Sequence, residues 1–214
     1  MKSVLLISSD VPVGWVDAGA VKSSNGTSSF DKQLQSKAAK FPVCKSFLAQ
    51  STADKQLMHL ASNLFQEPTV SGSTGHNELS NEATGYPSED AAKAAYAAVS
   101  SADTEACLGH VFHSIAAVIA NQVAQQSGVT PQVSVAFSRA PVPGVGDATT
   151  GYQAIISVSL SGQSIQIAMA MQLVRQGPYG MTYTATYFHK PPHNALGNSV
   201  QRSISRLQAA IAAG

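Results

Sequence analysis

The fold is decided by residues 152–187, which read YQAIISVSLSGQSIQIAMAMQLVRQGPYGMTYTATY. Apolar and polar side chains alternate there in three runs, with the period of two that strands show. The runs are Tyr152–Leu160, Ile165–Leu173 and Tyr179–Tyr187. Turn-forming residues separate them, Ser161-Gly162 first and then Gln176-Gly177-Pro178. Because turns this short join only antiparallel neighbours, the stretch predicts an antiparallel meander.

The segments around the meander supply further strands and helices. Strands are predicted over Leu57–Gln66, Glu78–Tyr86 and Val133–Ser138. Helices are predicted from the capping Ser88 to Val99, from the capping Ser101 to Gly128, and over Leu196–Ala213. Apolar residues recur at steps of three and four in the last two helices, so each buries one face.

This order of elements predicts an α+β fold, with a single antiparallel sheet that ends in a strand meander and packs against several helices. The length of 214 residues and the ample Leu, Ile, Val and Phe fit one domain. Its parts are an N-terminal segment and loop at 1–29, a mostly helical part with two strands at 30–127, the meander at 128–190 and a closing helix at 195–213.

Charged residues are scarce, at 12% of the chain against roughly 25% in an average soluble domain. Thirteen Lys and Arg against twelve Asp and Glu leave a net charge of +1, so the chain lacks the one-sign field that holds nucleic acid. No apolar run reaches the length of about 18 residues that marks a membrane span. We therefore expect no nucleic-acid partner and no transmembrane segment.

The only two thiols, Cys44 and Cys107, stand 63 positions apart. Surface polarity is carried by 28 Ser and 16 Gln, a composition common outside the cytosol. Pro42 is tolerated in the first turn of a short helix that carries Cys44, and Cys107 lies near the start of the long helix, so a disulfide can join the two. The bond would stabilise the fold by about 4 kcal/mol. The alternative is two buried reduced thiols.

Several motifs resemble a known group of proteins. They are Leu5-Leu6, the stretch DVPVGW at 10–15, the helix entry YPSEDAA at 86–92 and Ala106-Cys107-Leu108, followed by the meander and the closing helix. Together they resemble actinobacterial secreted proteins and lipoproteins that include the extracellular sensor domain of some mycobacterial serine/threonine kinases. The resemblance implies an envelope location and ligand sensing or carriage, and it carries over no catalytic residue. That kinase domain is expected to hold a pair of disulfides, whereas this chain has cysteines for one.

Motifs that could carry catalysis or bind a metal are isolated. His110 and His113 are three apart on a helix, a spacing that can direct two imidazoles at one metal, but no acidic or cysteine partner is near in sequence. Ser29 and Lys32 have the Ser-x-x-Lys spacing without a companion motif. Gly144-Val145-Gly146 lacks the third glycine of a phosphate cradle. We therefore predict no catalytic residue, no cofactor, no metal ligand and no enzymatic activity.

Aromatic and sulfur-containing side chains are the candidates for an apolar ligand pocket between sheet and helices. They are Met169, Met171, Tyr179, Tyr183 and Tyr187 of the meander, with Trp15 at the rim. We expect the odd-numbered positions of 165–173 and 179–187 to face the helices, with Met169 and Met171 buried and Gln166 and Gln172 exposed. Any half-buried strand alternates in this way, so the alternative is a plain core, with Trp15 anchoring the N-terminal segment.

These observations predict a non-enzymatic extracytoplasmic domain that binds a small apolar molecule, a lipid or an envelope component, as a sensor or carrier. It would be secreted, or anchored to a membrane through a segment outside this sequence. The alternatives are a structural or protein-interaction module without a ligand cavity, and a hydrolase. A dry cavity above ~300 Å³ lined by the meander would favour ligand binding over the structural module.

Overall fold

The computed structural model describes residues 4–20, 39, 41–44, 57–68, 75–188 and 194–212. Eight strands form one antiparallel sheet, with helices packed on it. The strands are β1 Val16–Ala20, β2 Met58–Ala61, β3 Asn63–Gln66, β4 Glu78–Gly85, β5 Gln132–Arg139, β6 Ala148–Leu160, β7 Gln163–Gln176 and β8 Tyr179–Tyr187. The long helices are α3 Glu89–Val99, α4 Ala102–Ser127 and α5 Ala195–Ala212. This arrangement confirms the predicted α+β fold and its C-terminal meander.

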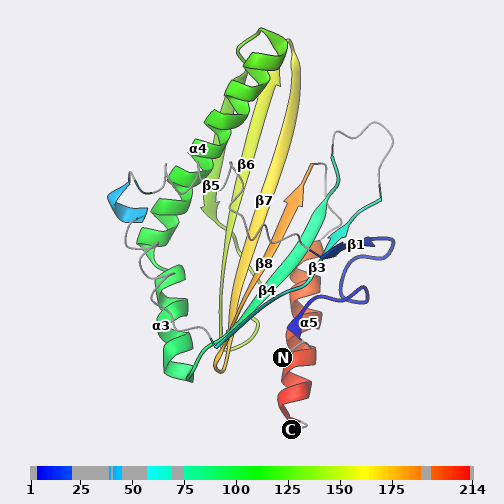
Figure 1. Cartoon of the computed structure of the whole chain (residues 1–214), viewed down its shortest axis with the longest axis vertical. Helices are drawn as coiled ribbons and strands as arrows, with labels where there is room; N and C mark the ends of the chain where they lie inside the picture. Colours follow the sequence, from blue (N-terminus) through cyan, green and yellow to red (C-terminus); the bar gives the residue numbers. More distant parts are fainter. Residues whose placement is uncertain are drawn as a thin grey trace.

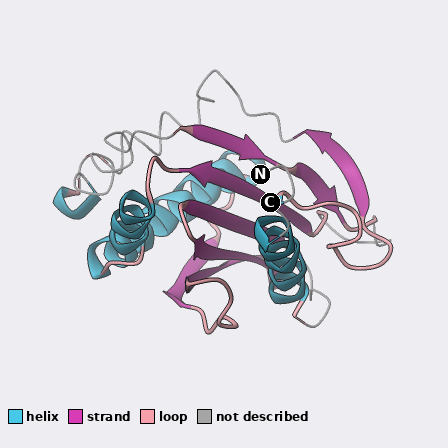
Figure 2. Ribbon diagram, turned by 90° about the horizontal axis from the view of Figure 1, so that it is seen from below, coloured by secondary structure: helices cyan, strands magenta, loops and turns pink. Residues whose placement is uncertain are grey.

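The sheet has helices on both of its faces. Its strands follow the order β1-β3-β4-β8-β7-β6-β5, and β2 also pairs with β4. Helices α3 and α4 lie on one face, here called the α4 face, and α5 lies on the other, here called the α5 face (Figures 1 and 2). The hydroxyl of Tyr152 donates to the Val99 carbonyl of α3 at 3.0 Å, whereas the hydroxyl of Tyr183 lies 2.7 Å from Ser203 Oγ of α5. Tyr152 and Tyr183 therefore point to opposite faces.

Two hairpin turns decide which side chains of the meander share a face. Leu160 pairs with Gln163 across the first turn, and Gln176 pairs with Tyr179 across the second. Each turn holds two residues, so an odd-numbered position stands opposite an even-numbered one, and directly opposed side chains point to the same face. The odd-numbered positions of β7 therefore point to the α4 face, and those of β8 point to the α5 face. Both sets face helices, as expected, but not the same helices.

The burial of Gln172 contradicts the predicted exposure pattern of β7. Its side chain is buried, with the residue 1% exposed, whereas Met169 and Met171 are half-buried and Gln166 is exposed. The prediction was wrong for Gln172 because β7 is covered on both faces at this level. In a sheet with two covered faces, alternation no longer separates core from solvent.

The first strands depart furthest from the prediction. The predicted strand Leu57–Gln66 is two strands, β2 and β3, which both pair with β4 and are separated by Ser62. Ser62 donates its backbone N–H to the Asn81 carbonyl at 2.8 Å, and its Oγ accepts from the Asn81 N–H at 2.9 Å. Strand β1 was not predicted, because its sequence VDAGA does not alternate.

The helix boundaries follow the predicted caps. The side chain of Ser88 accepts from the Ala91 N–H, the side chain of Ser101 accepts from the Thr104 N–H, and Gly128 ends α4 with φ +69°. By length and hydropathy, α4 is the one helix of the described residues that could cross a membrane, and in this structure it packs along β5. The absence of a transmembrane segment therefore stays a prediction.

A disulfide joins Cys44 to Cys107 of α4, with their Cα atoms 4.9 Å apart. Cys44 lies in the helical turn at 42–44, as expected, and both cysteines are buried. The apolar side chains packed around them are Phe41, Val43 and Val111. Of the mostly helical part predicted at 30–127, most of residues 30–57 lie outside the described residues.

The N-terminal segment packs on the α5 face beside the last helix. Trp15 is buried in the main core with Val4, Leu6 and Val11, so it anchors this segment and does not form the rim of a cleft. The Val4 carbonyl accepts from Asn81 Nδ2 at 3.1 Å and from Ser203 Oγ at 2.6 Å.

An ion pair completes this attachment. Arg206 of α5 donates to the buried carboxylate of Asp10 at 2.8 Å and to the Leu5 carbonyl at 2.7 Å. We call these contacts between residues 4–10 and α5 the terminal clasp.

Candidate functional site

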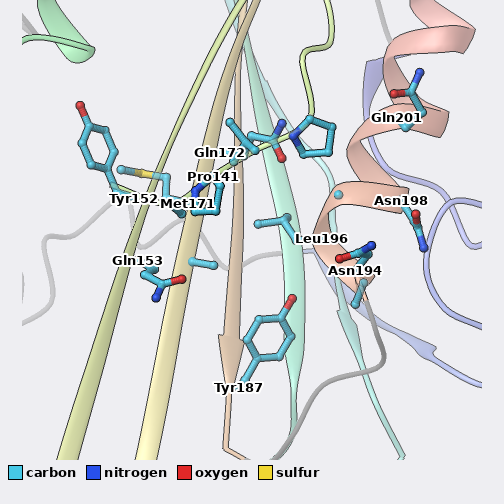
Figure 3. A pocket seen from close by; sticks show the side chains of 16 residues that line it. Pro141, Tyr152, Gln153, Met171, Gln172, Tyr187, Asn194, Leu196, Asn198 and Gln201 are labelled. Atoms are coloured by element: carbon cyan, nitrogen blue, oxygen red, sulfur yellow. The ribbon is translucent and has the colours of Figure 1, made fainter. Parts of the chain in front are cut away.

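A pocket of about 340 Å³ lies on the α5 face (Figure 3). The loop at 140–143 and the beginning of α5 form its walls, and strands β6, β7 and β8 form its floor. Its volume falls within the range of roughly 300–1,000 Å³ that small-molecule sites occupy.

The described lining of this pocket carries no Asp, Glu, Lys or Arg side chain. Its polar groups are mostly amides, supplied by Gln153, Gln172, Asn194, Asn198 and Gln201. Its apolar surface comes from Pro141, Val142, Pro143, Ala170 and Leu196. Because such a lining cannot neutralise an ionised group, it suits a neutral ligand that has both hydrogen-bonding and apolar parts.

Gln172 is the buried polar group of the pocket floor. One end of its amide pairs with Thr149, at 3.2 Å between Gln172 Nε2 and Thr149 Oγ1. The other end has no hydrogen-bond partner among the described residues. Buried polar groups are nearly always paired, and an unpaired one costs about 1–3 kcal/mol. The amide therefore has one end free to meet a ligand.

Tyr187 lies at the other end of the pocket, with its hydroxyl directed toward the beginning of α5 (Figure 3). Burial raises the pKa of the Tyr187 phenol to about 12, and a hydrogen bond from the Leu196 backbone N–H opposes this shift. The hydroxyl is therefore neutral at physiological pH and cannot supply a charge to the pocket.

The structure does not bring the six predicted pocket residues together. Tyr187 lines the pocket, whereas Tyr183 is fully buried in the core and Trp15 packs under the N-terminal segment. Met169 and Met171 are on the α4 face. Met171 belongs to the lining, but its side chain points away from the pocket, on the same side of the sheet as Tyr152 (Figure 3).

Tyr179 is the remaining member of that set. It is half-buried against the core on the α5 face, at the turn end of β8, and it does not line the pocket. The common pocket of methionines and tyrosines is therefore wrong, because the two-residue turn between β7 and β8 places the two sets on opposite faces.

The histidines of α4 are engaged separately. His110 stacks on Phe41 with ring centroids 4.3 Å apart, and His113 Nδ1 lies 2.8 Å from the Gly109 carbonyl of its own helix. The described residues hold no group of three or more His, Cys, Asp or Glu placed to bind a metal. That the chain binds no metal and no cofactor stays a prediction.

The other isolated motifs add no site. Ser29 and Lys32 lie outside the described residues. Gly146 has φ +67°, and a Cβ atom there would lie 2.6 Å from the Arg175 carbonyl oxygen. Glycine therefore allows the backbone at 146 to lie against the backbone at Arg175.

The amide residues of the pocket were missed from the sequence. The sequence predicted a second turn of three residues, Gln176-Gly177-Pro178, whereas Gln176 pairs with Tyr179 and the turn holds two residues. A turn of two residues places even-numbered positions of β7 on the same face as odd-numbered positions of β8, which groups Gln172 with Tyr187. The covering of this face by the loop at 140–143 depends on tertiary packing and had no local signal.

Comparison with known proteins gives only distant matches. No family model and no curated protein matches the chain. One similar solved structure is the extracellular domain of PknH from Mycobacterium tuberculosis, with a TM-score of 0.41 and 9% identity over 79% of this chain and 76% of that chain. Another is the protein of unknown function PA94 from Pseudomonas aeruginosa, with a TM-score of 0.24 and 11% identity over 74% of this chain and 83% of that chain. At this level of similarity, neither structure assigns the chain to a family or gives it a function.

Proposed function

We propose that this chain is a non-catalytic, extracytoplasmic domain that binds a small neutral molecule in the pocket beside α5. The observation that carries the proposal is the Gln172 amide, which is 1% exposed and has one end unpaired among the described residues. A ligand that hydrogen-bonds to this end recovers the free energy lost by burying it. A sheet with a purely structural role gains no stability from a buried amide that lacks a hydrogen-bond partner at one end.

The lining defines the class of ligand. Amide side chains pair with amide and hydroxyl groups, while Pro141, Pro143 and Leu196 contact methyl and methylene groups. N-acetylated sugars and short uncharged peptides combine these groups, and both are typical components of a cell envelope. A long acyl chain would leave the five amides without partners, so we disfavour a lipid tail.

Two features support a location outside the cytosol. The Cys44–Cys107 disulfide persists in oxidising compartments and is rare in the cytosol. The low content of charged residues, with Ser and Gln as the main polar residues, agrees with this compartment.

Saturation-transfer NMR with two probes, N-acetylglucosamine and N-acetylalaninamide, tests the proposal. We expect transfer from the protein to the acetyl methyl group of at least one probe. The variant Gln172→Met should weaken that binding about tenfold, because it removes one hydrogen bond to the ligand.

Gln166→Met is the matched control. Gln166 lies on the same strand and the same face as Gln172, but it is exposed and outside the pocket lining. Its variant should bind like the wild type. Absence of transfer to both probes, or equal binding by Gln172→Met, would overturn the proposal.

A further inference from the structure

We propose that the outer edge of β5, which pairs with no strand of the described residues, binds an extended, uncharged peptide segment of another protein, which adds a strand to the sheet beside α4. This surface is separate from the pocket on the α5 face. The proposal depends on the backbone of β5, on the groove beside it and on a comparison of the two sheet edges.

The outward backbone groups of β5 can be assigned from one hydrogen bond. The Ala140 N–H donates to the Gly151 carbonyl at 2.9 Å, and the register continues unbroken from there along β5 and β6. In an antiparallel pair, hydrogen-bonded and non-hydrogen-bonded positions alternate. Even-numbered residues of β5 therefore bond to β6, and odd-numbered residues direct their N–H and carbonyl groups outward. These residues are Val133, Val135, Phe137 and Arg139.

The two edges of the sheet differ in how they are protected. Edge strands usually resist pairing by being short, bulged, charged or interrupted by Pro. β1 follows this rule, with five residues, a register shift after Asp17 and Gly19 at φ +91°. β5 has eight residues in regular register, contains no Pro, and carries a single charged residue, Arg139 at its end. Among the described residues, no strand pairs with its outer edge.

A groove of about 440 Å³ runs between this edge and α4. Its helix side is formed by His113, Ala116, Ala117 and Ala120, and its strand side by Pro131 and residues 133–135. Among the residues that the structure describes, this lining holds no Asp, Glu, Lys or Arg. A strand placed here would direct every second side chain toward the alanines of α4, so those positions suit small apolar residues. The intervening side chains would lie beside the exposed Ser134 and Ala136 and suit polar residues.

A second copy of this chain fits the edge less well than a single peptide. Antiparallel pairing of two β5 strands about a two-fold axis would place both α4 helices on the same face of the joined sheet. Adjacent strands lie about 4.8 Å apart, whereas packed helices need about 8–10 Å between their axes. Because each α4 lines the free edge of its own β5, the two helices would compete for one space. One extended segment avoids this conflict.

The test is a selection of random ten-residue peptides displayed on phage, using the intact disulfide-bonded protein as the target. We expect enriched peptides with small apolar residues at alternate positions. Binding should fall about tenfold or more in Val135→Pro, which removes an outward N–H and spares the bonds to β6. It should fall similarly in Ala117→Trp, which fills the groove from the helix and leaves the strand intact. Gln122→Trp, at an exposed position outside the groove lining, is the matched control and should bind normally.

Amide exchange measured by NMR gives an independent reading. On addition of an enriched peptide, the N–H groups of Val133, Val135 and Phe137 should become protected, whereas those of Ser134 and Ala136 should be protected beforehand. The proposal is overturned if no peptide is enriched, or if the enriched peptides bind Ala117→Trp as well as wild type. It is also overturned if the protein alone forms a dimer that protects the same amides.

Discussion

Gln172→Met should make the protein more stable, although it removes a buried hydrogen-bonding side chain. Methionine has a similar length and no branch, so it can fill the same space beside Ala170 and Tyr183. The substitution removes the amide end that lacks a partner among the described residues, and it also removes the bond to Thr149. Thr149 is half-buried, so water can replace the lost partner.

The expected gain follows from these two opposing changes. Relief of an unpaired buried group is worth about 1–3 kcal/mol, and loss of one neutral hydrogen bond costs about 0.5–1.5 kcal/mol. The net gain is therefore about 1 kcal/mol, which raises the melting temperature of a chain of this size by about 2–4 °C.

Thermal unfolding followed by circular dichroism, with urea unfolding as a second measurement, checks this expectation. The exposed Gln166→Met should change the free energy of unfolding by no more than about 0.5 kcal/mol. If Gln172→Met instead melted several degrees below the wild type, both ends of the amide would be satisfied within the fold, and the reasoning that leaves one end for a ligand would fail.

Three further outcomes concern stability. Replacing Cys44 and Cys107 together with Ala should lower the free energy of unfolding by at most about 4 kcal/mol, because their bond spans 63 residues; equal urea midpoints with and without dithiothreitol would contradict this. Because folding raises the pKa of Tyr187 to about 12, this residue alone should lower the free energy of unfolding by about 2 kcal/mol as pH rises from about 10 to about 12, in addition to the fall caused by Tyr183, whose pKa folding raises further. Urea titrations across that pH range should show a smaller fall in the free energy of unfolding for Tyr187→Phe than for the wild type. An identical fall would refute the raised pKa of Tyr187. Arg206→Met should cost about 3–5 kcal/mol by leaving the buried Asp10 carboxylate without an opposite charge, and Asp10→Asn in the same chain should restore part of that loss. A double variant no more stable than Arg206→Met would count against the ion pair.

Local signals predicted the elements whose cause is local. The bounds of β8 and the caps at Ser88, Ser101 and Gly128 depend on residues within a few positions, so the sequence alone located them. β1 depends on its partner β3 for its conformation, and its own five residues carry no strand pattern.

The candidate site was predictable only in part. Periodicity located the strands that form its floor, but assigning a face also needed the length of each turn. The error at Gln172 came from treating a polar side chain as solvent-facing, which holds for a sheet with one open face and fails where α5 and the loop at 140–143 cover the second face. These coverings arise from contacts between distant parts of the chain.

The terminal clasp has a consequence for synthesis on the ribosome. Val4 and Leu5 hydrogen-bond to Ser203 and Arg206, which follow them by 199 and 201 positions. A nascent chain therefore exposes the apolar side chains of its N-terminal segment, Trp15 included, until the last helix has emerged. Contacts of such long range form late and slowly. Completion of the α5 face must wait until α5 has been synthesised, and a chaperone that shields the N-terminal segment can bind it while the residues between the two are being added.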